Sequence, residues 1–347
     1  MSIEVERLAG ADASSARALA EAERLAASGD VIAAIDHLQR STYDERDPLV
    51  DIRLAELRRD AFPALVANPA STPWPPAFDD PFPGETGLVE VHRSEATPEL
   101  VGGAIQHHGC VLVRGLLDAD VCERLVSTIE RAFDGLIAAN DGASADETAP
   151  WYVPLDAHPD FPPNQTDERA NLRWFRVCTM DSPRGMFEVV DAFEHAGVGD
   201  IVRGYLGARP SMSAGKWCLR RMPKRNIAGW HQEGSVFPNV PLRTMNVWLA
   251  LTPCGDDAPS LDVVPRRESR IHPVEKGFMM SHQQFAEVAG DAPQISPRYD
   301  AGDAMLFDEM VIHRTNTDKA MEGLRYSIES WFFATPGHPL ELGGIVY

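Results

Sequence analysis

Two histidines and one glutamate in this sequence could together hold a metal ion. His231 and Glu233 are separated by a single residue, and His313 follows much later in the chain. Two imidazoles and one carboxylate in this order can hold Fe(II) on one face and leave the other positions open for a cosubstrate and dioxygen. Neutral imidazoles and one carboxylate leave the metal with about one net positive charge, which suits a chelating anion. The pattern predicts an iron site with His231, Glu233 and His313 as metal ligands and catalytic residues.

An arginine and a serine farther along could bind the other end of such an anion. Arg325 and Ser327 lie in a segment with strand-like alternation, so both side chains point to the same face. A guanidinium binds a carboxylate through two parallel hydrogen bonds, and a hydroxyl can add another. Glu329 shares this face and would need a cation if buried, for which Arg220 or Arg221 is available.

Chance explains part of this pattern. The chain has eleven histidines, so a His-x-Glu segment alone is weak evidence and its context must supply the rest. Glu309, shortly before His313, is a second candidate for the carboxylate ligand, although a turn leading into the next strand is the favoured interpretation. Other histidines lack such a context and are interpreted as surface or core residues: His107, His108, His158, His195, His272, His282 and His338.

The segment Thr244–Thr252 predicts one wall of the site. One of its faces is apolar and typical of core packing: Met245, Val247, Leu249 and Leu251. The other face mixes polar groups with a tryptophan: Thr244, Asn246, Trp248 and Ala250. Both Trp248 and Trp217 lie on strands that flank the loop carrying His231 and Glu233, so we expect them to line a cavity rather than the core.

A basic cluster precedes His231 in a chain that is otherwise acidic: Arg220, Arg221, Lys224 and Arg225. One interpretation is a solvated loop that balances nearby acids. The other is a gate that selects a substrate bearing carboxylate, phosphate or sulfate. The sequence leaves both open.

The bulk composition narrows the class of protein. A hydrophobic content of 44% in 347 residues is enough for a large globular core with a smaller appendage. The net charge of −20 argues against nucleic acid and anionic membranes as partners, because both would repel the chain. The five cysteines are widely spaced without a C-x-x-C pair, and no signal peptide or apolar span is evident. We therefore expect a cytoplasmic protein that acts on a small molecule.

The elements that position these residues fall into three parts. Residues 1–68 have helical periodicity over Ser14–Ala27, Val31–Gln39 and Leu49–Val66, and form an N-terminal helical extension. Residues 69–96 form a Pro-rich connector whose Trp74 and Phe78 are expected to lie against a surface. Residues 97–347 contain short strands separated by turns, which indicate an antiparallel barrel or sandwich. The expected strands are Cys110–Val113, Trp217–Met222, Thr244–Thr252, Leu261–Val264, Ala304–Phe307 and Arg325–Ala334.

Several of these segments resemble the phytanoyl-CoA dioxygenase (PhyH) family. Trp230-His231-Gln232-Glu233, with Val236-Phe237-Pro238 after it, resembles the family's "WHQD…FP" segment. The run Asn246–Leu251 resembles its "WxAL" strand, and Ser260–Pro265 resembles its "GxLxVxPGSH" strand. Gly302-Asp303 through His313 resembles its "GD…F…H" run. The resemblance covers roughly residues 97–335.

This resemblance implies a mainly β fold with helical additions, built on a double-stranded β-helix (jelly roll, cupin-like) core. It implies Fe(II), 2-oxoglutarate and O₂ as cofactor and cosubstrates. Arg325 with Ser327 would bind the distal carboxylate of 2-oxoglutarate, and Trp248, Trp217 and Arg176 fall where the family contacts this cosubstrate. The implied reaction is oxidation, foremost hydroxylation, of a small and in some cases anionic metabolite or natural-product intermediate, with release of succinate and CO₂.

Two positions depart from the family pattern. The acid ligand is Glu233 where the family has Asp, so the carboxylate reaches one methylene farther. Pro265-Arg266-Arg267-Glu268 replaces the "PGSH" segment, which puts the usual substrates of the family in doubt. Because a carboxylate is present, halide binding at that coordination position, as in related halogenases, is disfavoured.

Other classes of protein stay open. The same ligand set could serve a divalent-metal hydrolase, which would have no need for Arg325 and Ser327. A non-catalytic jelly-roll binding protein is a third reading. The N-terminal helices could form a homo-oligomer, cover the barrel mouth or contact a carrier protein.

Overall fold

The computed structural model describes residues 12–41, 46–68, 72–156, 158–159, 175–223, 229–236, 242–274, 277–318 and 320–347. In these ranges, nine strands form a large sheet and two strands form a second sheet. The large sheet has the order β1-β2-β8-β6-β10-β4-β11, with β5 pairing β10 and β3 pairing β5. β1 and β2 run parallel, and the other paired strands of the described chain run antiparallel.

The strands of the large sheet are β1 (Val89–His92), β2 (Cys110–Arg114), β3 (Arg176–Cys178), β4 (Pro210–Ser213), β5 (Cys218–Met222), β6 (Thr244–Ala250), β8 (Ala304–Phe307), β10 (Arg325–Ala334) and β11 (Gly344–Val346). The second sheet pairs β7 (Ser260–Arg267) with β9 (Val311–Asn316). Every strand expected from the sequence is present, with ends that differ by a few residues. β1, β3, β4, β9 and β11 are too short or too weakly patterned to have been expected.

β6 and β10 are neighbours near the middle of the large sheet, and their alternation separates two environments. Met245, Val247 and Leu249 pack in a hydrophobic core with the helices, as the sequence predicts. Trp248 packs on the opposite face, in a cluster with residues of β7 and β9. We call the face of the large sheet that carries Asn246 and Trp248 the site face.

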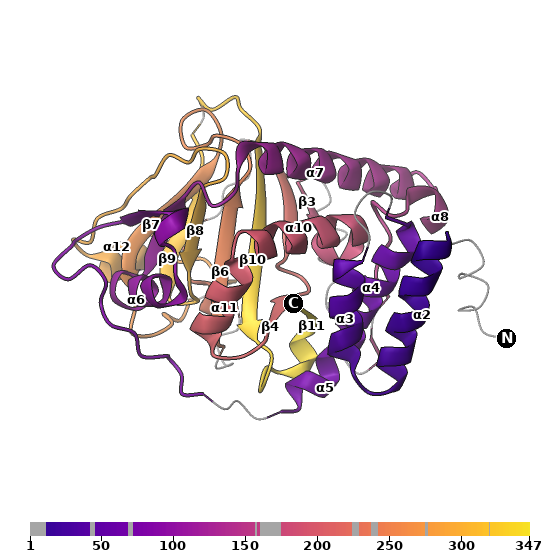
Figure 1. The fold of residues 1–347 in the computed structure, drawn as a ribbon. Coiled ribbons are helices and arrows are strands. Elements are labelled where there is room, and N and C mark those ends of the chain that lie inside the picture. The colour runs from indigo at the N-terminus through magenta and orange to yellow at the C-terminus, as the bar shows by residue number, and fades with distance from the viewer. Residues whose placement is uncertain are drawn as a thin grey trace.

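Helices cover the other face of the sheet. Figure 1 shows α7, α10 and α11 lying across it, and α7 contacts β3 and β5 while α11 contacts β6 and β10. The helices outside the N-terminal region are α6 (Pro98–His108), α7 (Ala119–Asn140), α8 (Ala145–Thr148), α10 (Pro183–His195), α11 (Val198–Leu206) and α12 (His282–Ala289). Single 3₁₀ turns occur at η1 (Arg93–Glu95), η2 (Thr179–Asp181), η3 (Glu233–Val236) and η4 (Leu340–Leu342).

Gly109 ends α6 and allows the next strand to start close to β7. Its φ angle is 85°, and a Cβ atom there would lie 2.5 Å from the backbone carbonyl carbon of Arg266. Only glycine tolerates both the left-handed backbone and this close approach.

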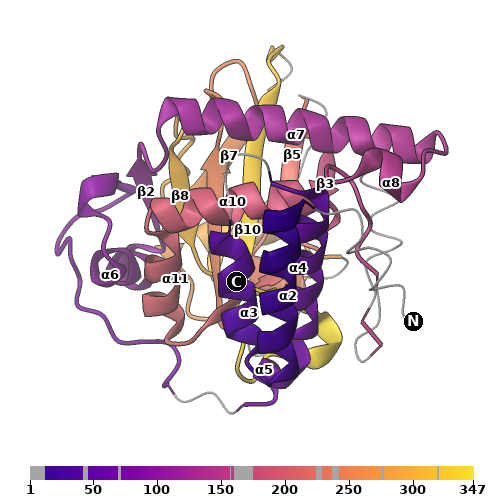
Figure 2. The same ribbon diagram turned by 45° about the vertical axis from the view of Figure 1, so that its right-hand side comes forward.

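The N-terminal helices form a second core beside α10, as Figure 2 shows. They are α2 (Ala13–Ala27), α3 (Val31–Arg40), α4 (Pro48–Asp60) and α5 (Phe62–Val66), so the segment expected as one helix from Leu49 to Val66 breaks at Ala61. Their apolar residues join Phe187 of α10, Phe333 of β10 and Val346 of β11 in one cluster.

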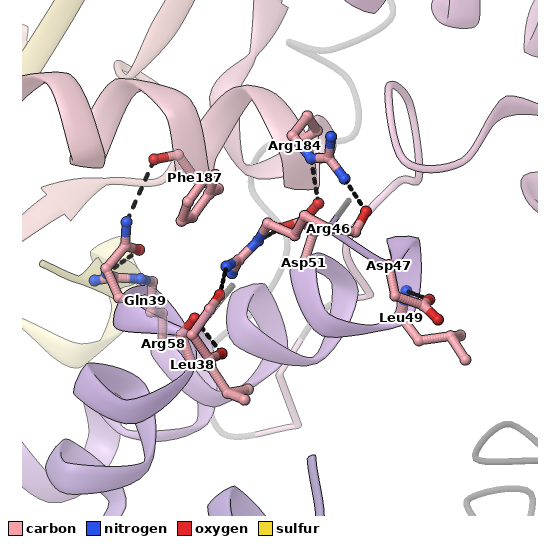
Figure 3. A network of polar contacts seen from close by, with 10 residues as sticks. Leu38, Gln39, Arg46, Asp47, Leu49, Asp51, Arg58, Arg184 and Phe187 are labelled. Atoms are coloured by element: carbon pink, nitrogen blue, oxygen red, sulfur yellow. Dashed lines mark hydrogen bonds and ion pairs between the residues drawn. The ribbon is translucent and has the colours of Figure 1, made fainter. Parts of the chain in front are cut away.

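Buried polar contacts also join the N-terminal helices to the rest of the molecule (Figure 3). The Asp51 carboxylate on α4 is fully enclosed and pairs with both Arg46 and Arg184, the latter at 2.5 Å. Arg58 donates to the carbonyl of Val346 at 2.7 Å and to Gln39 at 3.0 Å. Because burial is the main influence, the pKa of Arg58 falls to about 10.

The connector lies against the fold, as its aromatic residues predict. Trp74 packs edge-on and Phe78 stacks parallel to Tyr205 of α11, with ring centroids 5.5 and 6.2 Å away. The first strand of the large sheet begins at Val89, inside the range 69–96 that the sequence assigned to the connector. Val89 and Val91 are buried, and this segment pairs with β2. None of the helices in the described part of the chain is long and apolar enough to cross a bilayer.

Candidate active site

Backbone pairing brings the two distant histidines together. His231 and His313 form an isolated antiparallel bridge with reciprocal N–H to carbonyl hydrogen bonds of 3.0 Å. Glu233 opens η3, which turns its carboxylate back toward both rings. His231 Nε2 lies 3.8 Å from Glu233 Oε2, and His313 Nε2 lies 3.3 Å from Oε1. One ligand atom from each residue falls within 4.8 Å of the others. All three side chains are buried.

The hydrogen bonds of the two histidines orient their rings for a metal. His231 Nδ1 lies 2.8 Å from the Gly229 carbonyl, and His313 Nδ1 lies 3.2 Å from the Val311 carbonyl. A carbonyl only accepts, so Nδ1 of each ring carries a proton, and Nε2 is the atom that faces Glu233 and is left to bind a metal. Backbone carbonyls hold metal-binding histidines in this way in many proteins. The donor set therefore fits a divalent ion such as Fe(II).

The electrostatics of this cluster favour neutral His231 and ionised Glu233. Burial, with the charge of His313, lowers the pKa of His231 to about 4. Burial would raise the pKa of Glu233, but its hydrogen bond and charge interaction with His313 outweigh it and the pKa is lowered. Burial would lower the pKa of His313, and the same contact with Glu233 raises it instead. A bound cation would compete with the proton shared by this pair.

Two amide side chains hold in place the loop that carries His231 and Glu233. Asn246, on the site face of β6, donates to Glu233 Oε1 at 3.2 Å. Gln232 is fully buried and points away from the cluster, donating to the Arg270 and Met310 carbonyls at 3.1 and 2.8 Å. The sequence placed Asn246 on the correct face but gave no signal for this anchoring role of Gln232.

Arg325 is a buried cation for which the described part of the chain provides no acid. It is 1% exposed, donates to the Pro259 carbonyl at 3.1 Å and lies over the Trp248 ring at 5.1 Å. In the described ranges, no carboxylate lies within 4.0 Å of its guanidinium, and its Nε atom and the Ser327 hydroxyl have no hydrogen-bond partner. Burial lowers the pKa of Arg325 to about 10. An unpaired guanidinium in the interior costs stability unless an anion joins it.

Glu329 has the cationic partner that was expected for a buried carboxylate on this face. Arg220 pairs with its carboxylate, and Trp331 Nε1 donates to it at 3.1 Å. Arg221 points to the helix side instead, pairs with Glu130 at 2.6 Å and lies over a ring of α7. Strand alternation explains why the two adjacent arginines separate. Lys224 and Arg225 of the basic cluster, like Phe237 and Pro238, lie outside the described residues.

Three further residues that the sequence singled out lie outside the metal cluster. Glu309 lies in the turn between β8 and β9, and its carboxylate accepts from Thr244 Oγ1 at 2.7 Å, outside the metal cluster. Trp217 packs in the large core with the helices, and no described contact joins it to the metal cluster or Arg325. Arg176 lies opposite Arg220 in register, so it shares the face of Glu329, and donates to the Gly215 carbonyl at 3.2 Å.

Comparison with known proteins places these residues in a family context. The model of the family described as Phytanoyl-CoA dioxygenase (PhyH) matches residues 105–320. Among curated proteins, no sequence matches significantly. The structure of EctD from S. alaskensis with 2-oxoglutarate and 5-hydroxyectoine has 17% identity and a TM-score of 0.50, over 77% of this chain and 86% of EctD. The non-heme alpha ketoglutarate dependent carbocyclase SnoK from nogalamycin biosynthesis has 15% identity and a TM-score of 0.49, over 74% of this chain and 99% of SnoK. The likeness to EctD is one of fold.

Proposed function

Because the chain belongs to the phytanoyl-CoA dioxygenase family of non-haem Fe(II)/2-oxoglutarate-dependent oxygenases, we propose that it hydroxylates a small-molecule substrate, a metabolite or natural-product intermediate. Succinate and CO₂ are the expected coproducts. The observation that carries the proposal is the combination of the buried cluster of His231, Glu233 and His313 with the unpaired Arg325 on the same face of the sheet.

The residues of the cluster have separate roles in this proposal. His231, Glu233 and His313 would hold Fe(II), which together with 2-oxoglutarate and O₂ supplies the oxidising power for attack on a substrate C–H bond. Arg325 and Ser327 would bind the distal carboxylate of 2-oxoglutarate, which supplies a partner for the Arg325 Nε atom and the Ser327 hydroxyl, two groups without one among the described residues. Trp248 would pack against the cosubstrate beneath Arg325. We also propose that Arg176, which shares the face of Glu329, contacts the cosubstrate, whereas Trp217 packs in the core with the helices.

The carboxylate of Glu233 supports hydroxylation over halogenation. It fills the position that a halide would need, and the hydrogen bond from Asn246 holds the longer side chain in place. The protein contributes mainly orientation and the exclusion of water by the buried walls of the site.

The architecture supports a double-stranded β-helix core for this activity. The β7–β9 pair packs across the site face of the large sheet, and the metal cluster links β9 to the loop before β6. We propose that residues 97–347 form the oxygenase domain, and that residues 1–68 are an extension that also offers a surface for self-association.

Succinate formation tests the proposal directly. Purified protein is supplied with 2-oxoglutarate under air, with and without Fe(II), and succinate is quantified. Iron-dependent succinate, abolished by His231→Ala and by Zn(II) in place of Fe(II), is the expected result. A hydrolase would keep its activity with Zn(II) and form no succinate. A binding protein without turnover would form no succinate with either ion.

A further inference from the structure

Lys216 is a second cation near the metal cluster to which the described residues offer no acidic partner. It lies in the turn between β4 and β5, and it is the only lysine among the residues that the structure describes. Its Nζ atom lies 5.2 Å from the ring centroid of Trp331 and 5.8 Å from that of Phe278. No carboxylate of the described chain lies within ion-pair distance of it, whereas Arg220 and Arg221 each have one.

The two aromatic rings beside Lys216 connect it to the reaction centre. Phe278 packs edge-on against the His231 ring, with centroids 5.1 Å apart. Trp331 lies opposite Asn246 in the β6–β10 register, and Asn246 binds Glu233. The ammonium group is therefore separated from His231 by one aromatic ring, that of Phe278.

Lys216 and Arg325 lie at opposite ends of the site face. Arg325 is the first residue of β10, and Trp331 is six residues farther along the strand, about 20 Å of extended backbone. A cosubstrate that joins the metal cluster to Arg325 extends toward the end of the site face where Arg325 lies. The side occupied by Lys216, Phe278 and Trp331 remains for the substrate.

We propose that Lys216 binds an anionic group of the substrate while Phe278 and Trp331 pack against the adjoining apolar part. This inference rests on the proposed function, because it takes the metal cluster as the reaction centre. It names the substrate class as a small organic acid whose oxidised carbon lies near its anionic group. An ammonium flanked by aromatic rings suits this class, since the rings contact the apolar segment and the charge pairs with the acid.

Paired probes test the proposal by binding rather than turnover. Anaerobic protein loaded with Fe(II) and 2-oxoglutarate is titrated with phenylacetate, hexanoate and benzylphosphonate, and with phenylacetamide and hexanamide as neutral counterparts. We expect at least one acid to bind ten or more times as tightly as its amide, with the carboxylate and phosphonate arms showing which anion is preferred. Lys216→Gln should remove this preference, and Lys216→Arg should keep most of it. Equal affinities for acids and amides, or no binding of any acid, would overturn the proposal.

A control variant separates local from general electrostatics. Arg298→Gln removes an exposed charge that pairs with Asp256 on the surface, so it changes the net charge by the same amount. The preference for acids should persist in this variant. If Arg298→Gln reduces it as much as Lys216→Gln does, the preference reflects the overall charge and the inference fails.

Cosubstrate binding distinguishes the roles of the two cations. The affinity for 2-oxoglutarate, measured anaerobically, should change less than twofold in Lys216→Gln and fall sharply in Arg325→Ala. A comparable loss in both variants would assign Lys216 to the cosubstrate and refute its role in substrate binding. The proposed function is tested separately, by succinate formation in the unsubstituted protein.

Discussion

At the scale of single residues, the site depends on charges that are buried before any ligand arrives. Arg325 is enclosed by Trp248 and the Pro259 carbonyl, and nothing in the described chain neutralises it. Such a side chain destabilises the ligand-free protein and favours whatever anion completes it. This is a physical reason for selective binding of a dianion that also reaches the metal.

We expect Arg325→Ala to weaken 2-oxoglutarate binding by about 3 kcal/mol, on the order of 100-fold, because the distal carboxylate would be buried without a partner. Arg325→Lys should recover part of the affinity, since it keeps the charge but loses the two-pronged geometry. Anaerobic calorimetry with the Fe(II)-loaded protein measures both. Near-normal affinity in Arg325→Ala would refute the assignment of this residue.

His338 should make stability depend on acid pH. Its ring stacks on Phe333 with centroids 3.5 Å apart, and burial lowers its pKa to about 3. An unfolded histidine titrates near 6.5, so between these values the unfolded state binds a proton that the folded state does not. The contribution of this histidine to stability is therefore constant above pH ~6.5 and falls as the pH drops below it.

His338→Phe keeps the stacked ring but cannot titrate. Compared with the unsubstituted protein, the variant should lose less of its free energy of unfolding between pH 7 and pH 5, as measured by urea denaturation. Carboxylates titrate in both proteins and cancel in this comparison. Parallel pH profiles would show that His338 is not held neutral by the fold.

At the scale of elements, α4 and α10 are joined by a charge network rather than by apolar contacts alone. Asp51 of α4 is fully enclosed between Arg46 and Arg184, and Arg46 also lies over the Phe187 ring at 3.6 Å. Each partner of a buried ion pair depends on the others, because a charge left alone in the interior is costly. The network fixes how the N-terminal helices sit on the covering helices of the sheet.

Asp51→Asn should therefore destabilise the fold by about 3 kcal/mol, because the buried guanidinium of Arg46 and the partly buried one of Arg184 lose their counterion. Asp60→Asn on the same helix removes the partner of Arg59 near the surface and should cost less than about 1 kcal/mol. Chemical denaturation of both variants measures the difference. Equal effects would mean that the Asp51 network adds no more than a surface pair.

At the scale of the whole molecule, the N-terminal helices and the sheet share a core. Phe333 belongs to β10, the strand that also carries Arg325, and it packs with Phe62 of α5 at a centroid distance of 5.9 Å. The helices therefore support the strand that carries the cosubstrate-binding residues. We therefore expect them to unfold together with the sheet rather than as a separate module.

Deletion of residues 1–68 should expose Phe187, Phe333 and Val346, which pack against the N-terminal helices. We expect the melting temperature to fall by roughly 10 °C or more, since each kcal/mol of lost stability corresponds to about 2–4 °C in a chain of this size class. Differential scanning calorimetry measures the change. An unchanged melting temperature would show that the extension folds independently and would support the three-part division of the chain.

The sequence by itself determined the residue types of the site and the faces on which they lie. The alternation in β6 and β10 is a local property of extended backbone, so periodicity alone places Asn246 with Trp248 and Arg325 with Ser327. The pairing of the two strands then brings both pairs to one face of the sheet. The His-x-Glu pair and the later histidine were visible as motifs, and together with neighbouring segments they carried the resemblance to the family whose model matches residues 105–320.

Only the tertiary structure decided which groups meet. It chose Arg220 over Arg221 as the partner of Glu329, gave Glu309 a hydrogen bond with Thr244, and placed Trp217 in the core. It also brought Lys216 and Phe278, on separate turns without any sequence signal, to the same side of the metal cluster. Such contacts depend on how distant segments close around the sheet, and no local pattern in the chain encodes that closure.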